Sequence, residues 1–88
     1  MLKLVTEGKF DKDISKYLRR KKDMQKLWDL VLLLTENKPL PPKNRNHKLH
    51  GEFGNYWECH IEPDWLLIYK KTSTEIILSR MGTHSDLF

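Results

Sequence analysis

The chain has one cysteine among its 88 residues, and this scarcity sets the first limit on what it can be. A single thiol cannot form an internal disulfide, which excludes a disulfide-stabilised secreted framework and favours a reducing compartment. The longest strongly apolar run, residues 30–34, is far shorter than the roughly 20 residues that a membrane span requires. The first residues also lack the basic and then apolar order of a secretory signal. We therefore expect a soluble, cytoplasmic protein that does not associate with membranes.

The chain is also too short for more than one modest hydrophobic core, since domains of this size bury only about 60 to 65% of their unfolded surface. We expect a single domain over residues 1–88, with no large cavity for a bulky cofactor. Lys and Arg number 16 against 12 Asp and Glu, a net charge of +4. This excess suits nucleic acid or an acidic protein partner, although a solvated basic surface without any partner has the same composition.

Hydrophobic periodicity predicts an α+β fold. Residues 1–5 alternate as a short strand, and a helix follows whose expected apolar face is Phe10, Ile14, Tyr17 and Leu18. Asp23 is placed to cap a second helix, with an expected face of Met24, Leu27, Trp28, Val31, Leu32, Leu34 and Thr35. Strands are expected near 56–62, 65–72 and 75–81, joined by turns short enough for hairpins. The sequence thus predicts an N-terminal strand, a two-helix hairpin and a mainly antiparallel sheet with both helices on one face.

Residues 59–88 concentrate groups suited to proton transfer. Side chains alternate along the strand around residue 60, so His60 is expected on the open face of the sheet while Cys59 faces the core. Asp64 lies in the following turn, and Arg80 and His84 lie near the end of the last strand. Histidine exchanges protons near neutrality, and arginine is the preferred fork for phosphate oxygens. Together these residues suggest cleavage of a phosphodiester, although each one alone is equally well explained as an ordinary surface residue.

A loop of prolines and asparagines over 39–46 delivers a further histidine, His47, and raises the question of a metal. The spacing of His47 and His50 suits metal ligands in principle. However, Cys59 and His60 are adjacent on a strand and face opposite sides, and no second cysteine can complete a closed zinc site. We therefore expect no metal and no other cofactor.

Aromatic residues accompany the basic groups of the chain. Tyr56, Trp65 and Phe88 lie near a turn, a strand start and the terminus, where stacking on nucleic-acid bases is possible. For Trp28 and Trp57 we expect packing in the core instead.

Three stretches of the second half, residues 46–51, 59–69 and 80–88, carry a resemblance to a known family. Through them, and through the order of its elements, the whole chain resembles the RelE superfamily of toxin–antitoxin ribonucleases, and within it the YafQ-like branch. The resemblance implies a toxin that enters the ribosomal A site, cleaves the mRNA there and is held inactive by a cognate antitoxin. Operator DNA would be bound only through the toxin–antitoxin complex.

The resemblance also implies roles for individual residues. His47, His60, Asp64 and His84 match catalytic positions, whereas Trp65, Arg80 and Phe88 match positions that contact or support the substrate. His50 and Cys59 depart from the family pattern, and His50 leaves open which loop histidine does the work.

The chemistry of these residues suits a reaction that needs no metal. Attack by the RNA 2′-hydroxyl requires a base for its proton, an acid for the leaving 5′-oxygen and a cation for the phosphorane charge. We expect His84 to be the acid, Asp64 or His60 the base, His47 a supporting group and Arg80 the phosphate ligand. Two alternatives remain: a ParE-like toxin of the same fold that is not a nuclease, and an adaptor that binds nucleic acid or protein. The histidine set argues against the ParE-like toxin, because a protein that only binds has no need of it.

Overall fold

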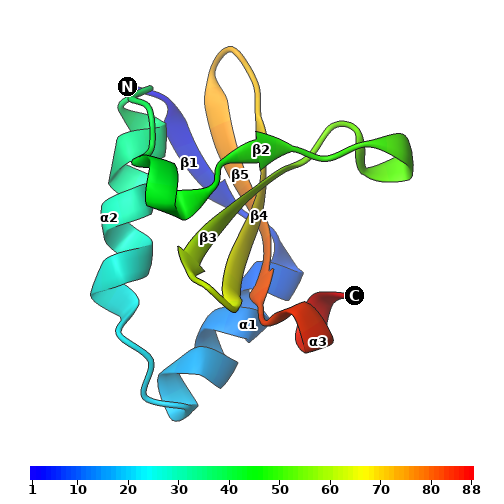
Figure 1. Ribbon diagram of the computed structural model, residues 1–88. Coiled ribbons are helices and arrows are strands. Elements are labelled where there is room, and N and C mark those ends of the chain that lie inside the picture. The colour runs from blue at the N-terminus through cyan, green and yellow to red at the C-terminus, as the bar shows by residue number, and fades with distance from the viewer.

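The computed structural model describes residues 1–88, with the side chain of Phe53 excepted, and its main elements follow the predicted order. The strands are β1 (Lys3–Thr6), β2 (His47–Lys48), β3 (Trp57–Glu62), β4 (Trp65–Lys71) and β5 (Glu75–Gly82). The helices are α1 (Gly8–Arg19), α2 (Met24–Thr35) and α3 (His84–Leu87), with two 3₁₀ turns, η1 (Pro42–Asn44) and η2 (Gly51–Phe53) (Figure 1).

The five strands form one sheet in the order β1-β5-β4-β3-β2. The pairs β2–β3, β3–β4 and β4–β5 are antiparallel, as predicted, whereas β1 pairs with β5 in parallel. After β1, the helices α1 and α2 carry the chain from one edge of the sheet to β2 at the opposite edge. The sheet then continues back toward β1, so β1 pairs with the last strand, β5, and not with the strand that follows it in the sequence. Both helices pack on one face of the sheet, where apolar side chains from α1, α2, β3, β4 and β5 form a single core. The opposite, open face carries the polar residues considered below.

The predicted caps and faces of the helices are partly confirmed. The Asp23 carboxylate accepts a hydrogen bond of 3.1 Å from the backbone N–H of Gln25 and so caps α2. The predicted burial of three apolar residues is wrong: Leu18, Trp28 and Leu32 are exposed. The buried stripe of α2 instead follows helical spacing through Leu27, Leu30, Val31 and Leu34.

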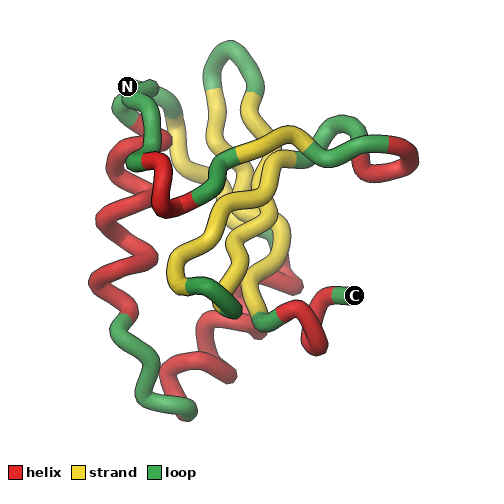
Figure 2. The backbone as a smooth tube through the Cα atoms, viewed as in Figure 1, coloured by secondary structure: helices red, strands yellow, loops and turns green.

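The loop between α2 and the sheet has more structure than the sequence suggests. It contains η1 and ends in β2, which adds a fifth strand at the edge of the sheet (Figure 2). The side chain of buried Asn44 donates a hydrogen bond of 2.7 Å to the carbonyl of His60, and the Tyr69 hydroxyl donates one of 2.6 Å to Asn46. These two contacts hold the loop against β3 and β4 and deliver His47 to the open face. No helix of the described chain combines the length and apolar character that crossing a bilayer demands.

Candidate active site

The strand register assembles the polar residues of the open face in rows. One row crosses four strands through paired residues, from His47 to Glu58, Ile68 and Arg80. The next row runs from His60 to Leu66 and Gly82. Neighbouring strands lie about 4.8 Å apart, so residues that are far apart in the sequence, from His47 to Gly82, fall within one compact patch. The sheet thus brings the loop histidine, His60 and Arg80 together on this face.

Asp64 and His84 form a hydrogen-bonded pair at the end of the sheet. The Nδ1 of His84 lies 2.6 Å from Oδ1 of Asp64, and the backbone N–H of His84 donates to the same oxygen at 2.9 Å. These two hydrogen bonds, the backbone one first, lower the pKa of Asp64. The carboxylate therefore stays ionised at neutral pH and fixes the ring of His84 with Nε2 free to exchange a proton. Both side chains are more than half exposed.

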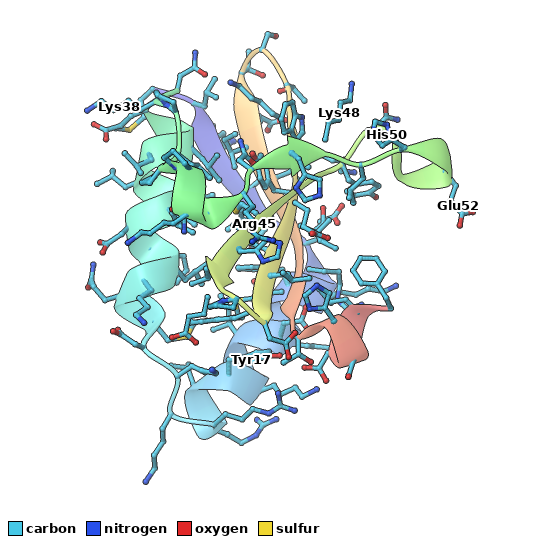
Figure 3. All side chains as sticks on the ribbon, in the orientation of Figure 1. Tyr17, Lys38, Arg45, Lys48, His50 and Glu52 are labelled. Atoms are coloured by element: carbon cyan, nitrogen blue, oxygen red, sulfur yellow. The ribbon has the colours of Figure 1, made fainter. Side chains whose placement is uncertain are left out.

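Glu58 lies between two further histidines, His47 and His60. Its Oε1 is 3.6 Å from Nε2 of His47 and 3.6 Å from Nε2 of His60. Glu58 is buried, and the His60 side chain is only 13% exposed. The structure thus shows His47, not His50, as the loop histidine that contacts this cluster. His50 lies out along the loop that leads to η2 (Figure 3).

The hydrogen bonds of these two rings determine where their hydrogens lie. Nδ1 of His47 is 2.7 Å from the carbonyl oxygen of Arg45, and Nδ1 of His60 is 3.2 Å from that of Pro63. A carbonyl oxygen only accepts, so each neutral ring carries its hydrogen on Nδ1, and Nε2 is the nitrogen that can accept a proton. The Glu58 carboxylate lies 3.6 Å from both Nε2 atoms and is placed to pair with an imidazolium formed at either ring.

The two histidine sites face each other across the end of β3. The ring centroids of His60 and His84 are 6.0 Å apart, with a tilt of 59° between the planes. Each ring has its own carboxylate, Glu58 for His60 and Asp64 for His84. Two imidazoles at this separation can act on opposite sides of one phosphate, which is the arrangement that acid–base cleavage of RNA requires.

Arg80 is held by an acid that the sequence did not single out for this purpose. Its Nε donates to Oδ2 of Asp13 at 2.8 Å, and the same oxygen accepts the backbone N–H of Met81 at 3.0 Å. The hydrogen bond to Asp13 raises the pKa of Arg80. A guanidinium has five N–H donors, so Arg80 keeps donors for a phosphate after Asp13 has fixed its orientation.

Of the aromatic residues expected to bind substrate, Phe88 is exposed but Trp65 is not. The predicted substrate contact of Trp65 is wrong for its ring, which is fully buried and stacks on Tyr17 with 5.9 Å between centroids. The reason is its register. Trp65 begins β4 on the face that packs against α1, so its ring lies in the core and not on the open face.

The short helix α3 is attached to α1 through one carboxylate. Asp86 and Thr83 form a capping box at the start of α3. The buried hydroxyl of Tyr17 donates to Asp86 and accepts the backbone N–H of Thr83 at 2.9 Å. Lys16 and Arg20 each lie 3.2 Å from the Asp86 carboxylate. Since His84 is the first residue of α3, this network positions the His84 ring.

Three residues that build this site are missing from the sequence-based set: Glu58, Asp13 and Asp86. Glu58 shares its face with His60, and that alternation was the available signal. Asp13 and Asp86 make contacts across 67 and 69 residues of sequence, which no local pattern reveals. Among the described residues, no group of three or more His, Cys, Asp and Glu is placed to hold a metal ion.

Comparison with known proteins identifies the family. The model of the bacterial YafQ toxin of type II toxin–antitoxin systems matches residues 2–88. The mRNA interferase toxin YafQ of Escherichia coli K12 is 44% identical over 82 residues, which cover 92% of this chain and 89% of that protein. YafQ in the E. coli DinJ–YafQ complex superposes with a TM-score of 0.93 at 40% identity, over all of this chain and 99% of that one. A copper-bound mutant toxin from Helicobacter pylori superposes at 0.96, with 41% identity over both whole chains. The chain therefore belongs to the YafQ family of bacterial type II toxins.

Proposed function

We propose that this chain is a cytoplasmic endoribonuclease that cleaves mRNA in the ribosomal A site and is held inactive by its cognate antitoxin. The observation that carries the proposal is the pair of carboxylate-supported imidazoles, His60 with Glu58 and His84 with Asp64, whose rings lie 6.0 Å apart. The family membership supports it, since the E. coli relatives are mRNA interferases.

In the proposed mechanism, His60 is the base. Its Nε2 takes the proton of the RNA 2′-hydroxyl, and the imidazolium that forms gains an ion pair with buried Glu58. The 2′-oxygen attacks the adjacent phosphorus, and the bond to the 5′-oxygen breaks. His84, oriented by Asp64, gives its proton to that leaving oxygen. Arg80 stabilises the charge that develops on the phosphorane, and His47 supports Glu58 from the other side.

The nature of the products tests this order of events. An mRNA with a single 2′-deoxy nucleotide at the cleavage position should bind and remain uncut, because the nucleophile is gone. Normal products should carry a 2′,3′-cyclic phosphate or 3′-phosphate and a 5′-hydroxyl. Products with a 5′-phosphate would show that water is the nucleophile, and the roles given to His60 and His84 would then be wrong.

We propose that the reaction needs no metal, because the side chains supply the acid, the base and the cation. Ribosome-independent cleavage of a short RNA in excess chelator should proceed at the rate measured without chelator. Copper is one ion to test, because a toxin from H. pylori has been solved with copper bound, and zinc is the other, because histidine is a common zinc ligand. Cleavage that stops on chelation and returns with either ion would contradict the proposal.

The antitoxin is proposed to cover the basic surface around this site with an acidic or amphipathic segment. YafQ of E. coli has been solved in complex with DinJ, which makes a protein partner the natural regulator here. Complementary charge mainly accelerates such encounters, while apolar anchors set the lifetime of the complex. Saturating cognate antitoxin should abolish cleavage, and undiminished cleavage would refute the inhibition.

A gyrase-inhibiting toxin of the ParE type remains the second candidate, because it shares the fold. Mapping of cleaved cellular mRNA at nucleotide resolution separates the two. Cuts in translated frames that disappear in His84→Ala support the ribonuclease, whereas intact mRNA with inhibited gyrase supports the alternative.

A further inference from the structure

The turn η1, which lies between the end of α2 and β2 (Figure 2), contains a buried residue in an otherwise exposed segment. Asn44 is 5% exposed, whereas the other residues of 41–48 are exposed. Its Nδ2 donates a hydrogen bond of 2.7 Å to the backbone carbonyl of His60, while its Oδ1, also buried, accepts none from a described residue. Asparagine is mostly found on protein surfaces, and a leucine would fill the same volume without burying that oxygen. The donor is therefore what distinguishes asparagine from an apolar residue at this position.

The carbonyl that Asn44 binds lies where β3 loses its regular partners. β2 has only two residues and pairs with Trp57 and Glu58, so it ends before it reaches His60. On the other side of β3, the register with β4 shifts between His60 and Glu62, which is the mark of a bulge. A bulge disrupts the hydrogen-bond ladder locally and changes the direction of nearby side chains. The amide of Asn44 therefore replaces a strand partner for His60.

The next residue of the chain holds the loop histidine. Arg45 has φ +46° and ψ +48°, a left-handed conformation that residues other than glycine adopt infrequently. Its carbonyl oxygen lies 2.7 Å from Nδ1 of His47. The backbone N–H groups of Asn44 and Arg45 donate to the carbonyls of Pro41 and Pro42 at 3.0 and 3.1 Å. Because prolines also restrict φ, the turn is a stiff unit that contacts both histidines.

The two contacts of this turn meet at one carboxylate. Oε1 of Glu58 lies 3.6 Å from Nε2 of His47 and 3.6 Å from Nε2 of His60. The turn reaches the first imidazole through its ring and the second through its backbone. A shift of the turn would therefore change both distances to Glu58 together.

We propose that Asn44 is a positioning residue of the reaction and acts through His60. Its amide holds the backbone of β3 at the point from which the imidazole extends, and the turn that it anchors presents the Arg45 carbonyl to His47. The assignment rests on the proposed ribonuclease function and deepens it. The two Nε2 atoms are then aligned with Glu58 before RNA arrives, and prior alignment of this kind lowers the entropic part of the barrier.

Asn44→Leu is the direct test, because leucine keeps the branched shape of the side chain and removes the donor. On ribosome-bound mRNA, kcat should fall roughly 10-fold while KM stays at the parental value, since no contact with RNA is lost. The ring ¹⁵N resonances of His47 and His60 should move as these rings lose their single neutral tautomer, whereas those of His84 should not. The resonances are recorded without RNA, so they report positioning independently of cleavage. Asn44→Ala repeats both measurements with a smaller side chain, in case leucine prevents folding.

Thr35→Val is the matched control. The Thr35 hydroxyl also donates to a backbone carbonyl, that of Leu32, at 2.9 Å, and Thr35 is 7% exposed. It lies beside Ser73 and Thr74 of the β4–β5 turn, at the end of the sheet away from the catalytic cluster. Valine keeps the shape of threonine and removes the donor, so the control loses the same kind of hydrogen bond. Its kcat and all its histidine resonances should equal those of the parent.

The outcomes separate the positioning role from the ribonuclease function. If kcat or the resonances of His47 and His60 stay at parental values in both Asn44 variants, the positioning role is refuted even where the parent cuts mRNA normally. A loss of kcat that Thr35→Val shares would also refute it, because the loss would then follow stability alone. Moved resonances in Asn44→Leu, with no cleavage of mRNA by the parent, would instead refute the ribonuclease function and leave the positioning of the two rings standing.

Discussion

The two histidine–carboxylate pairs of this protein contain the same chemical groups in opposite surroundings. In the His84 pair the side chains are 57% and 64% exposed, whereas in the His60–Glu58 contact they are 13% and 10% exposed. The exposed pair is hydrogen-bonded at 2.6 Å, whereas the nitrogen and oxygen of the buried pair are 3.6 Å apart, beyond hydrogen-bond distance. The first arrangement suits a ring that approaches substrate and releases a proton. The second suits one that gains by taking a proton up.

The pairs also differ in how the chain builds them. The sheet itself sets the position of Glu58 and His60, because they alternate on β3 and are fixed by the neighbouring strands. Asp64 and His84 belong to a turn and to a helix of four residues, and a separate set of contacts from α1 must hold that helix in place. The exposed pair should therefore tolerate substitution without loss of the fold, and the buried pair less so.

Breaking the exposed pair should have the largest effect on the reaction. His84→Ala removes the acid that protonates the leaving oxygen, for which we expect a loss of about 10² to 10⁴-fold in cleavage rate. The ring is exposed and adds little to the core, so the thermal unfolding midpoint should stay at the parental value. Single-turnover cleavage of ribosome-bound mRNA, together with a thermal melt, measures both quantities.

Lys12→Ala provides the control, because Lys12 is exposed on α1 and lies apart from the cluster. It should change neither rate nor stability. If His84→Ala cleaves as fast as the parent, or is inactive only because it unfolds, then His84 is structural and the assignment of acid and base must be abandoned.

Breaking the buried pair should have the next largest effect. Glu58→Gln keeps the volume of the side chain but removes the charge that stabilises the imidazolium of His60, and its amide can donate to the Nε2 lone pair. We expect a rate loss of roughly 10-fold to 10²-fold. Glu58→Asp keeps a carboxylate and should retain part of the cleavage rate that Glu58→Gln loses. The ¹⁵N shifts of the His60 ring report the same change without RNA, and a parental rate in Glu58→Gln would show that His60 works without its acid.

Much of the fold could be predicted because each element carries a local signal. The alternation on β3, the cap at Asp23 and the short turns before β4 and β5 all lie within a few residues of what they determine. The errors fall where packing decides instead. Trp28 lies outside the buried stripe of α2, whereas Trp65 begins a strand against α1 and is fully buried.

The same distinction between local signals and packing applies to the residues of the site. The family resemblance predicts His47, His60, Asp64 and His84 as site residues, and the structure places them near one another, while their catalytic roles stay a prediction. Their partners could not be predicted, since a glutamate on a strand or an aspartate on a helix is usually solvated. Only the folded sheet shows that Glu58 is buried between two imidazoles, and only the docking of α1 shows that Asp13 orients Arg80.

The contacts that hold α3 in place can be weakened without substituting His84 or Asp64. Tyr17→Phe removes the hydroxyl that donates to Asp86 and accepts from Thr83, which should lower the free energy of unfolding by about 1–2 kcal/mol. For a domain of this size, each kcal/mol corresponds to roughly 4–8 °C in Tm. Cleavage should fall only a few-fold, with His84 less well placed. An unchanged melting curve would show that the capping box alone holds α3.

The same network makes stability depend on pH in the acid range. The hydrogen bond from Tyr17, followed by that from Lys16, holds the pKa of Asp86 far below its ordinary value of about 3.9. A carboxyl with a depressed pKa contributes its full stability above that ordinary value and loses it as the pH falls further. The parent should therefore lose stability below about pH 4 more steeply than Asp86→Asn does. The free energy of unfolding of both proteins can be measured by denaturant titration at pH 5 and at pH 3. An equal loss in the parent and in Asp86→Asn would contradict this.

The smallest effect on cleavage is expected from a reagent directed at Cys59, on the core-facing side of β3. Cys59 adjoins both Glu58 and His60, yet it points into the core, is fully buried, and burial followed by the nearby charge of Glu58 raises its pKa to about 12. The thiolate, which is the reactive form, is therefore almost absent at pH 8. Iodoacetamide should leave the native protein unmodified and its cleavage rate unchanged, and should label Cys59 rapidly only in denaturant. Rapid labelling of the native protein would mean that β3 opens readily and that Glu58 is exposed to water. The contrast between the buried His60–Glu58 pair and the exposed His84–Asp64 pair would then fail.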